Sequence, residues 1–217
     1  MNENSRRKAA LIASCVAMFW IGTFTFGLPG VMAPYWQETF KVGRGAVSQL
    51  PQWVMLALGL FMYVSGKYQE ILGHARMVAI GTVIMGVSTI MLGRYQSIGW
   101  VYLWAFTTGA SSTFLYIPAL TVVQRWYPQR RGLVTGLVNL IFGLSASPMS
   151  PIFHRMLTSM GPVAMTTVVG VLALITGLVV APFVRVPEQP NMTTDTQAAQ
   201  QTTLGRSLSV SEAVRTK

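Results

Sequence analysis

Charge is what this sequence has least of. Only 10% of its 217 residues are charged and 52% are hydrophobic, with a mean hydropathy of +0.48, whereas an ordinary soluble domain has about 25% charged residues. Its single cysteine, Cys15, lies within an apolar run, so neither a disulfide framework nor a Cys/His zinc site is available. This composition excludes an ordinary soluble domain and indicates a protein that is embedded in a lipid bilayer.

Acidic residues are missing from the middle of every long apolar run. The six acids lie in the tails, in loops or at the ends of runs: Glu3, Glu38, Glu70, Glu188, Asp195 and Glu212. Ionisable residues at membrane depth are functional by default, so no intramembrane carboxylate is present to carry a proton or hold a cation. No serine has a histidine and an acid beside it within the membrane, which a hydrolytic triad would need. We therefore expect no enzyme, no cofactor and no metal site.

Six apolar segments are long enough to cross a bilayer, which takes about 20 mostly apolar residues. They are residues 9–35, 46–66, 77–92, 99–123, 133–157 and 162–184. The first is too long for the core of a signal peptide, so we expect it to be retained as a helix. The sequence thus predicts an all-α integral membrane protein in which residues 9–184 form a six-helix transmembrane bundle.

Positive charge falls mostly on one side of these spans. Twelve Lys and Arg residues lie on one side, and four, Lys41, Arg44, Arg94 and Arg155, lie on the other. Cytoplasmic loops retain an excess of Lys and Arg, so we expect both termini in the cytoplasm, with the bundle in the plasma (inner) membrane. Residues 1–8 would be a cytoplasmic N-terminus. Residues 185–217 would be a cytoplasmic linker that ends in an amphipathic segment, the amphipathic lead-in. The basic residues form no stripe for nucleic acid.

One basic gap, residues 125–132 with the sequence RWYPQRRG, has a residue order that charge alone does not require. The order Trp126, Tyr127, Pro128 resembles the Trp-Phe-Pro-x-x-Arg-Gly signature after the fourth helix in the oxalate/formate antiporter and monocarboxylate transporter branch of the major facilitator superfamily. Residues 26–34, followed by 43–48, resemble the aromatic-x7-Pro and Ser-Arg-Ala-x-Val-Ser lead into helix two of that branch. Residues 116–118, Tyr-Ile-Pro, stand where the branch has Tyr-x-Pro.

A second loop, residues 66–76, resembles the cytoplasmic gating motif of the superfamily, Gly-x-x-x-Asp-x-x-Gly-Arg-x-Arg. Gly66, Gly73 and Arg76 match that pattern, while Glu70 replaces the Asp and His74 replaces a basic residue. The resemblance implies that this loop, with Glu70, clamps helix ends when the cytoplasmic side closes. The basic gap at residues 125–132, called the elbow from here on, contains the remaining gating candidates, Arg125, Arg130 and Arg131. The alternative is that these arginines only set topology and touch lipid headgroups.

The resemblance covers one half of such a transporter, whose usual form has two six-helix halves. It implies the N-terminal half of an alternating-access carrier for a small organic anion, such as a monocarboxylate or dicarboxylate. The partners would be the bilayer, that anion and a second six-helix half, which is a separate chain, a second copy, or the rest of a longer protein. Cationic side chains of the second half would neutralise the substrate. The alternative is a non-transporting membrane anchor or assembly subunit derived from the same fold.

Aromatic and weakly polar side chains are the candidates for a substrate-binding wall. On a helix that turns by about 100° per residue, Phe19 and Phe26 share one face, and Ser112 and Tyr116 share another. The positions of Phe19, Phe26 and Tyr116 resemble those of an aromatic cage in the oxalate branch. Trp53 lies at a suitable depth in the second span. The alternative for the phenylalanines is lipid contact or helix packing.

Asn139 is the polar exception in a stripe of small residues along the fifth span. That stripe consists of Gly132, Gly136, Gly143, Ser147 and Ser150. Small residues on one face allow helices to approach closely, so we expect the stripe to be a packing surface and Asn139 to be a substrate-binding candidate.

Overall fold

The protein is described here by a computed structural model, which covers residues 3–187 except for the side chain of Glu70. The predicted linker and its amphipathic lead-in, from residue 188 onward, lie outside this range. Every regular element within it is helical: α1 (Glu3–Gly22), η1 (Thr23–Gly27), α2 (Leu28–Phe40), α3 (Arg44–Ser48), α4 (Leu50–Leu72), α5 (His74–Leu92), α6 (Ile98–Trp126), η2 (Pro128–Arg130), α7 (Arg131–Leu144), α8 (Ala146–Val180) and η3 (Ala181–Phe183). The all-α prediction is confirmed.

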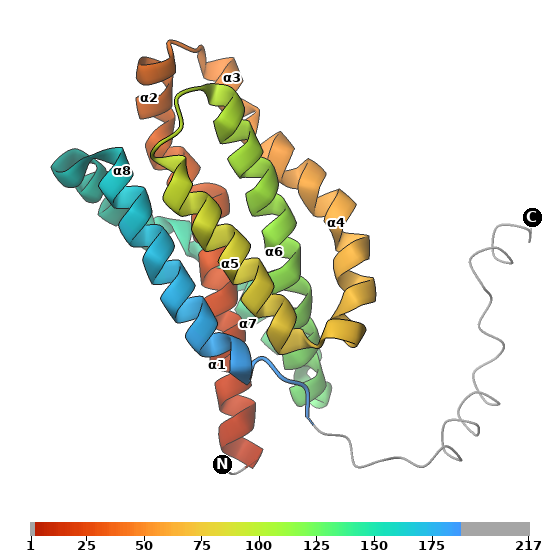
Figure 1. Ribbon diagram of the computed structural model, residues 1–217. Helices are drawn as coiled ribbons and strands as arrows, with labels where there is room; N and C mark the ends of the chain where they lie inside the picture. The colour runs from red at the N-terminus through yellow and green to blue at the C-terminus, as the bar shows by residue number, and fades with distance from the viewer. Residues whose placement is uncertain (1–2, 188–217) are drawn as a thin grey trace, which may run out of the picture. The chain divides into compact units, whose positions relative to one another are not determined.

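Five helical stretches of the described chain are long and apolar enough to cross a membrane, and the last, residues 128–183, is twice the usual length. This stretch contains a reversal at Gly161, whose φ of 78° is a conformation that favours glycine. Gly22 lies against the carbonyl of Phe142, and Trp20, two residues earlier, donates a hydrogen bond to Thr176. Residues on both sides of Gly161 therefore contact α1, and the chain reverses its direction at Gly161 (Figure 1). This reversal divides the last stretch into the predicted fifth and sixth spans.

The first span is continuous but irregular. Between α1 and α2 lies η1, a five-residue π-helix, and Pro29 follows it at the start of α2. A π-helix has a wider turn than an α-helix, and proline has no N–H to donate to the preceding turn. The side chains before and after η1 consequently do not keep the phase of one unbroken α-helix.

Small residues determine how closely the helices pack. Gly109 of α6 lies against the backbone of Val54 in α4. Gly86 of α5 lies against Gly170 in the part of α8 that follows Gly161, called its second arm. Side-chain hydrogen bonds add ties between helices, such as the 2.9 Å bond from the Ser65 hydroxyl to the carbonyl of Thr113. Close backbone contact and satisfied polar groups are what helix association in a bilayer requires.

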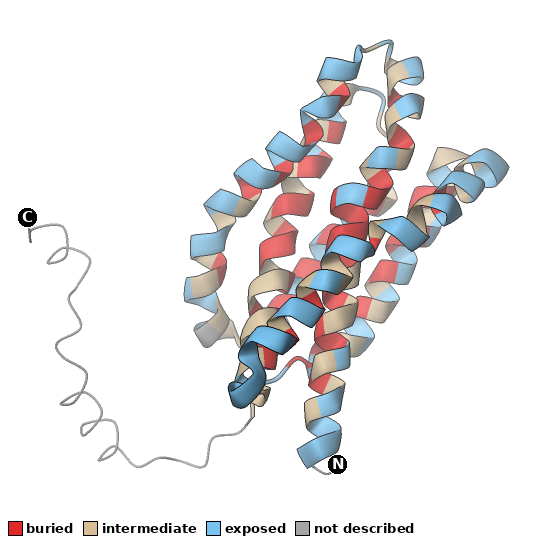
Figure 2. Cartoon of the chain, turned by 180° about the vertical axis from the view of Figure 1, so that it is seen from behind, coloured by how far each residue is buried: buried red, intermediate tan, exposed pale blue. Residues whose placement is uncertain are grey.

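Exposed residues run along the outer helices of the bundle (Figure 2), and many of them are large and apolar. Val179 and Ile175 on the second arm of α8, and Met91 on α5, are among the exposed large side chains. Soluble monomers rarely expose so much contiguous apolar surface. Lipid or further transmembrane helices are needed to cover it, in agreement with the membrane location inferred from composition.

Candidate functional site

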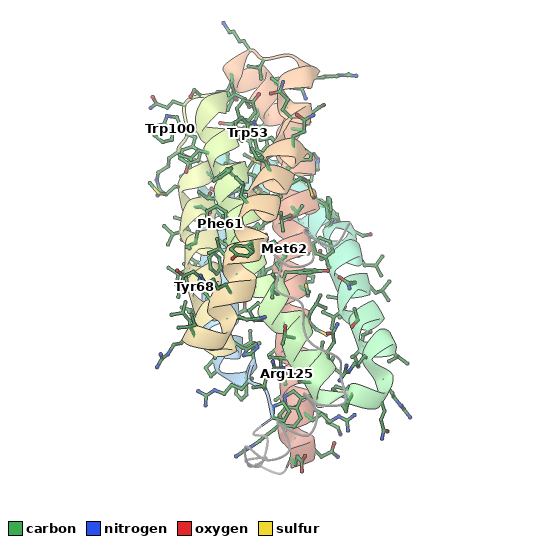
Figure 3. All side chains as sticks on the ribbon, turned by 90° about the vertical axis from the view of Figure 1, so that its right-hand side faces the viewer. Trp53, Phe61, Met62, Tyr68, Trp100 and Arg125 are labelled. Atoms are coloured by element: carbon green, nitrogen blue, oxygen red, sulfur yellow. The ribbon has the colours of Figure 1, made fainter. Side chains whose placement is uncertain are left out.

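The two ends of the bundle differ in charge. At one end, here called the elbow end, Arg7 contacts Tyr127, and Trp126 contacts Arg185. At the opposite end, Tyr102 donates a 2.8 Å hydrogen bond to the carbonyl of Ala46. Figure 3 shows Arg125 near the elbow end, and Trp53 and Trp100 near the other. Nine Lys and Arg residues of the described range lie in helix ends and loops at the elbow end, against four at the opposite end. The structure thus segregates the basic residues as the sequence count anticipates.

Three of the predicted substrate-binding residues meet between these two ends. The Tyr116 hydroxyl on α6 donates a 3.2 Å hydrogen bond to Oδ1 of Asn139 on α7. The ring of Tyr116 packs edge-on against Phe142, with 6.4 Å between centroids, and Phe142 packs in the same way against Phe26, at 5.6 Å. Phe26, Tyr116, Asn139 and Phe142 are called the aromatic–amide cluster from here on.

The aromatic–amide cluster lies at the surface of the bundle. Phe26 is 47% exposed, and the other three side chains are partly buried. On the same helix as Asn139, a methyl group built on Gly136 or Gly143 would meet no atom within 4 Å. The glycines of the small-residue stripe therefore pack against no other helix in the described part of this chain, and the cluster borders an open face.

Phe142 was missed by the sequence analysis. It follows Asn139 by three residues, a spacing that places two side chains on neighbouring parts of a helix surface. Nothing in the sequence singles it out, because phenylalanine in a membrane helix also occurs at lipid contacts. Only its ring contacts with both Phe26 and Tyr116 distinguish it.

The other predicted wall residues lie outside the aromatic–amide cluster. Phe19 packs edge-on against Trp20 and lines an open apolar cleft of about 440 Å³ between α1 and α7. Trp53 stacks on Tyr102 near the opposite end. Ser112 is buried, and its hydroxyl donates a 2.7 Å hydrogen bond to the carbonyl of Thr108.

The opposite end also carries the loop between α5 and α6. Tyr95 in this loop stacks on Trp100, with 5.9 Å between ring centroids. Partial burial raises the pKa of the Tyr95 phenol. Stacked aromatic residues at a bundle end are typical of the membrane–water interface.

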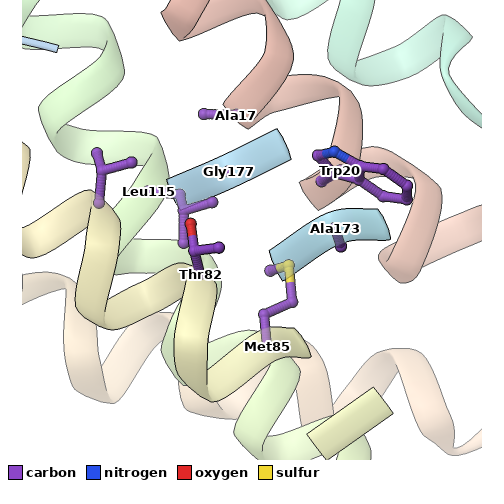
Figure 4. A pocket seen from close by; sticks show the side chains of 8 residues that line it. Ala17, Trp20, Thr82, Met85, Leu115, Ala173 and Gly177 are labelled. Carbon is purple, nitrogen blue, oxygen red and sulfur yellow. The ribbon is translucent and has the colours of Figure 1, made fainter. Parts of the chain in front are cut away.

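The interior of the bundle is too tightly packed to hold a substrate at the level of Trp20. The cavity in Figure 4, which Trp20, Thr82, Met85 and Ala173 help to line, has a volume of about 10 Å³. That is roughly the space of one water molecule. This cavity therefore holds nothing larger than a water molecule.

The gating candidates occupy the elbow end as the sequence order suggests. Gly73 joins α4 to α5 with a φ of 81°, which explains the need for glycine there. Gly66 lies in α4, one turn before Glu70. Arg76, Arg125, Arg130 and Arg131 are exposed. The predicted pairing of Glu70 falls on a side chain outside the described residues.

The aromatic residues of the elbow have defined partners. The Arg7 guanidinium lies over the ring of Tyr127, with Cζ 3.8 Å from the ring centroid. The Trp126 indole N–H donates a 2.7 Å hydrogen bond to the carbonyl of Arg185, just after η3. The elbow therefore connects the start of α1 with the end of the sixth span, and the order Trp126, Tyr127 has a structural reason.

Removing either partner of the Arg7–Tyr127 contact is expected to destabilise the elbow end. A cation over an aromatic ring at a partly exposed site contributes roughly 1 kcal/mol. Arg7→Gln, Tyr127→Leu and the double variant, unfolded chemically in detergent micelles, should give a coupling energy of about that size. Lys8→Gln is the matched control, because Lys8 is exposed. Additive losses in the double variant would contradict the contact.

Comparison with known proteins identifies the class. The described chain is a bundle of apolar helices with basic residues concentrated at one end. The family model described as Major Facilitator Superfamily matches residues 12–215. The chain belongs to the major facilitator superfamily, a family of transporters and not of enzymes.

Several curated relatives are similar at low identity. Monocarboxylate transporter 2 of Meriones unguiculatus is 26% identical over 152 residues, which are 64% of this chain and 29% of the relative. The uncharacterized MFS-type transporter YhjX of Escherichia coli is 23% identical over 182 residues, 80% of this chain and 43% of the relative. Human monocarboxylate transporter 2 is 22% identical over 176 residues, 79% of this chain and 36% of the relative. The chain thus spans less than half the length of these relatives.

Proposed function

We propose that this chain forms the N-terminal half of an alternating-access transporter for a small organic anion, a monocarboxylate or dicarboxylate, and that it works with a second six-helix half. The observation that carries the proposal is the aromatic–amide cluster on the open face of the bundle. Transporters of this superfamily bind their substrates between two halves. Two of the relatives described above are named monocarboxylate transporters, which supports the substrate class.

The aromatic–amide cluster supplies rings and an amide but no positive charge. Within the middle of the described spans there is no Lys or Arg, so the charge that neutralises a carboxylate has to come from the second half. The open glycines of α7, Gly132, Gly136 and Gly143, allow another helix to approach closely. These glycines support a second half packed near the cluster. An anchor subunit would need neither the cluster nor the open glycines.

The remaining predicted site residues take secondary places in this proposal. Phe19 extends the wall toward the elbow end. Trp53, which stacks on Tyr102 near the opposite end, and the buried Ser112 lie outside the cluster. The loop with Gly66, Glu70, Gly73 and Arg76 forms the gate together with Arg125, Arg130 and Arg131. The excess of basic residues at the elbow end supports a plasma-membrane location with that end, and both termini, in the cytoplasm.

Tyr116→Ala is expected to weaken substrate binding in the transporter assembled with its second half. The change removes the cluster's phenol and opens the ring contact with Phe142. One lost hydrogen bond contributes about 1 kcal/mol, so the concentration for half-maximal uptake should rise at least about fivefold. Uptake of labelled oxalate, formate, lactate and pyruvate into proteoliposomes provides the measurement.

The matched control is Tyr95→Ala, which removes a tyrosine from the opposite end. Its uptake should stay at the wild-type level. If Tyr116→Ala also behaves as wild type, the cluster is not the substrate site. If the assembled wild-type protein carries none of the four acids, the proposed substrate class is wrong.

A further inference from the structure

The hydrogen bond between Tyr116 and Asn139 has a definite direction. The side-chain amide of Asn139 has one oxygen that accepts and one nitrogen that donates. Its Nδ2 donates a 3.0 Å hydrogen bond to the carbonyl of Thr135, one turn earlier on α7. A carbonyl can only accept, so the nitrogen has to face Thr135. Oδ1 therefore faces Tyr116 and accepts the phenol proton at 3.2 Å.

Thr135 is itself held in place. Its hydroxyl accepts a 3.1 Å hydrogen bond from Nε2 of Gln124 on α6. Gln124 on α6 thus bonds the hydroxyl of Thr135, and Asn139 bonds the carbonyl of the same residue and accepts from Tyr116 on α6, so these hydrogen bonds connect α6 and α7 at two places. The amide of Asn139 cannot rotate by half a turn without placing its oxygen against the Thr135 carbonyl. Networks of this kind fix orientations more firmly than single bonds.

We propose that Asn139 is a positioning residue that holds the phenol proton of Tyr116, so that Tyr116 presents an oxygen lone pair to the ligand. This deepens the proposed function and rests on it. A phenol has one proton, and that proton is already used by Asn139. The cluster therefore favours an acid that donates a hydrogen bond at this point over an acid that offers only acceptors there.

Lactate and pyruvate are suitable probes because they share a carbon skeleton and differ at one group. Lactate carries a hydroxyl at C2, which donates to the Tyr116 oxygen, whereas pyruvate carries a keto oxygen, which only accepts. In the transporter assembled with its second half, wild type should bind lactate at least about fivefold more tightly than pyruvate, the effect of one hydrogen bond.

Asn139→Leu releases the phenol proton of Tyr116, which is then free to donate to the keto group of pyruvate. The lactate-to-pyruvate ratio of affinities should fall at least about fivefold or invert. Tyr116→Phe removes the phenol and should abolish the preference. The double variant should match Tyr116→Phe alone. Asn139→Ala provides a second test if the leucine variant fails to fold, and Leu140→Ala, a change at an exposed neighbour on α7, is the control.

The outcomes separate this inference from the proposed function. A wild-type preference for pyruvate overturns the positioning role. So does a lactate-to-pyruvate ratio that Asn139→Leu leaves unchanged, because a purely structural role of Asn139 weakens the binding of both acids equally. The same is true if Asn139→Leu still changes the ratio when Tyr116 is phenylalanine. Transport of oxalate or formate without binding of either probe overturns the inference and leaves the transport function standing. Transport of none of these acids removes the proposed function itself.

Discussion

Alanine in place of Gly109 is expected to prevent the stable packing of the bundle. A Cβ at this position would collide with the backbone carbonyl of Val54 and lie 2.9 Å from the Cβ of Ala57, both on α4. Backbone atoms cannot rotate away as a side chain can, so α4 and α6 would have to separate. Overpacking of this kind costs about 1–3 kcal/mol or more. This exceeds the helix propensity that alanine gains over glycine, which is at most about 1 kcal/mol.

The measurement is the apparent melting temperature and the yield of folded protein in detergent, which should both fall. Gly143→Ala is the matched control, because the same substitution in α7 meets no atom within 4 Å. It should leave the melting temperature unchanged or raise it slightly. Equal losses in both variants would show that glycine itself, and not the contact between α4 and α6, is needed.

The second expected result is that this chain, reconstituted alone, moves no organic anion. A carboxylate brought to the middle of the bilayer without a compensating cation costs several kcal/mol. The described spans contain no Lys or Arg at that depth. The aromatic–amide cluster offers hydrogen bonds, which replace only part of the hydration that a carboxylate loses.

Flux of oxalate, formate, lactate and pyruvate into proteoliposomes should match that of empty vesicles. Co-expression with a six-helix half that carries an intramembrane Arg or Lys should produce uptake, and exchange of that residue for Gln should abolish it. Robust anion flux from the lone chain would show that no cationic residue of a different second half is needed.

The sequence by itself determined the features that depend on neighbours along the chain. Apolar length gave the six spans, including the break near Gly161, because a helix that spans lipid has to satisfy its backbone within its own segment. The uneven distribution of Lys and Arg predicted the charge difference between the two ends. Short motifs around Tyr116, Gly73 and Trp126 indicated the superfamily, which the family match confirmed.

The tertiary structure decided which face of each helix is covered. A periodic pattern places Phe19, Gly22, Thr23 and Phe26 on one face, but η1 changes the phase, so that Gly22 and Thr23 are buried while Phe26 is exposed. On α6, Ser112 shares a face with Tyr116, yet only Tyr116 reaches the open surface. Periodicity gives the angle between two side chains, and only the position of the neighbouring helix decides which of them is covered.

Contacts between distant residues were also decided only by the tertiary structure. Arg7 meets Tyr127, and Phe142 joins Phe26 to Tyr116. Gly109 and Gly143 look alike in the sequence. They differ because α4 packs directly against Gly109, whereas no atom lies within 4 Å of a Cβ built on Gly143. The proton of Tyr116 is directed by Asn139 and Thr135 on another helix. Such properties depend on how helices pack across space, which no local pattern along the chain encodes.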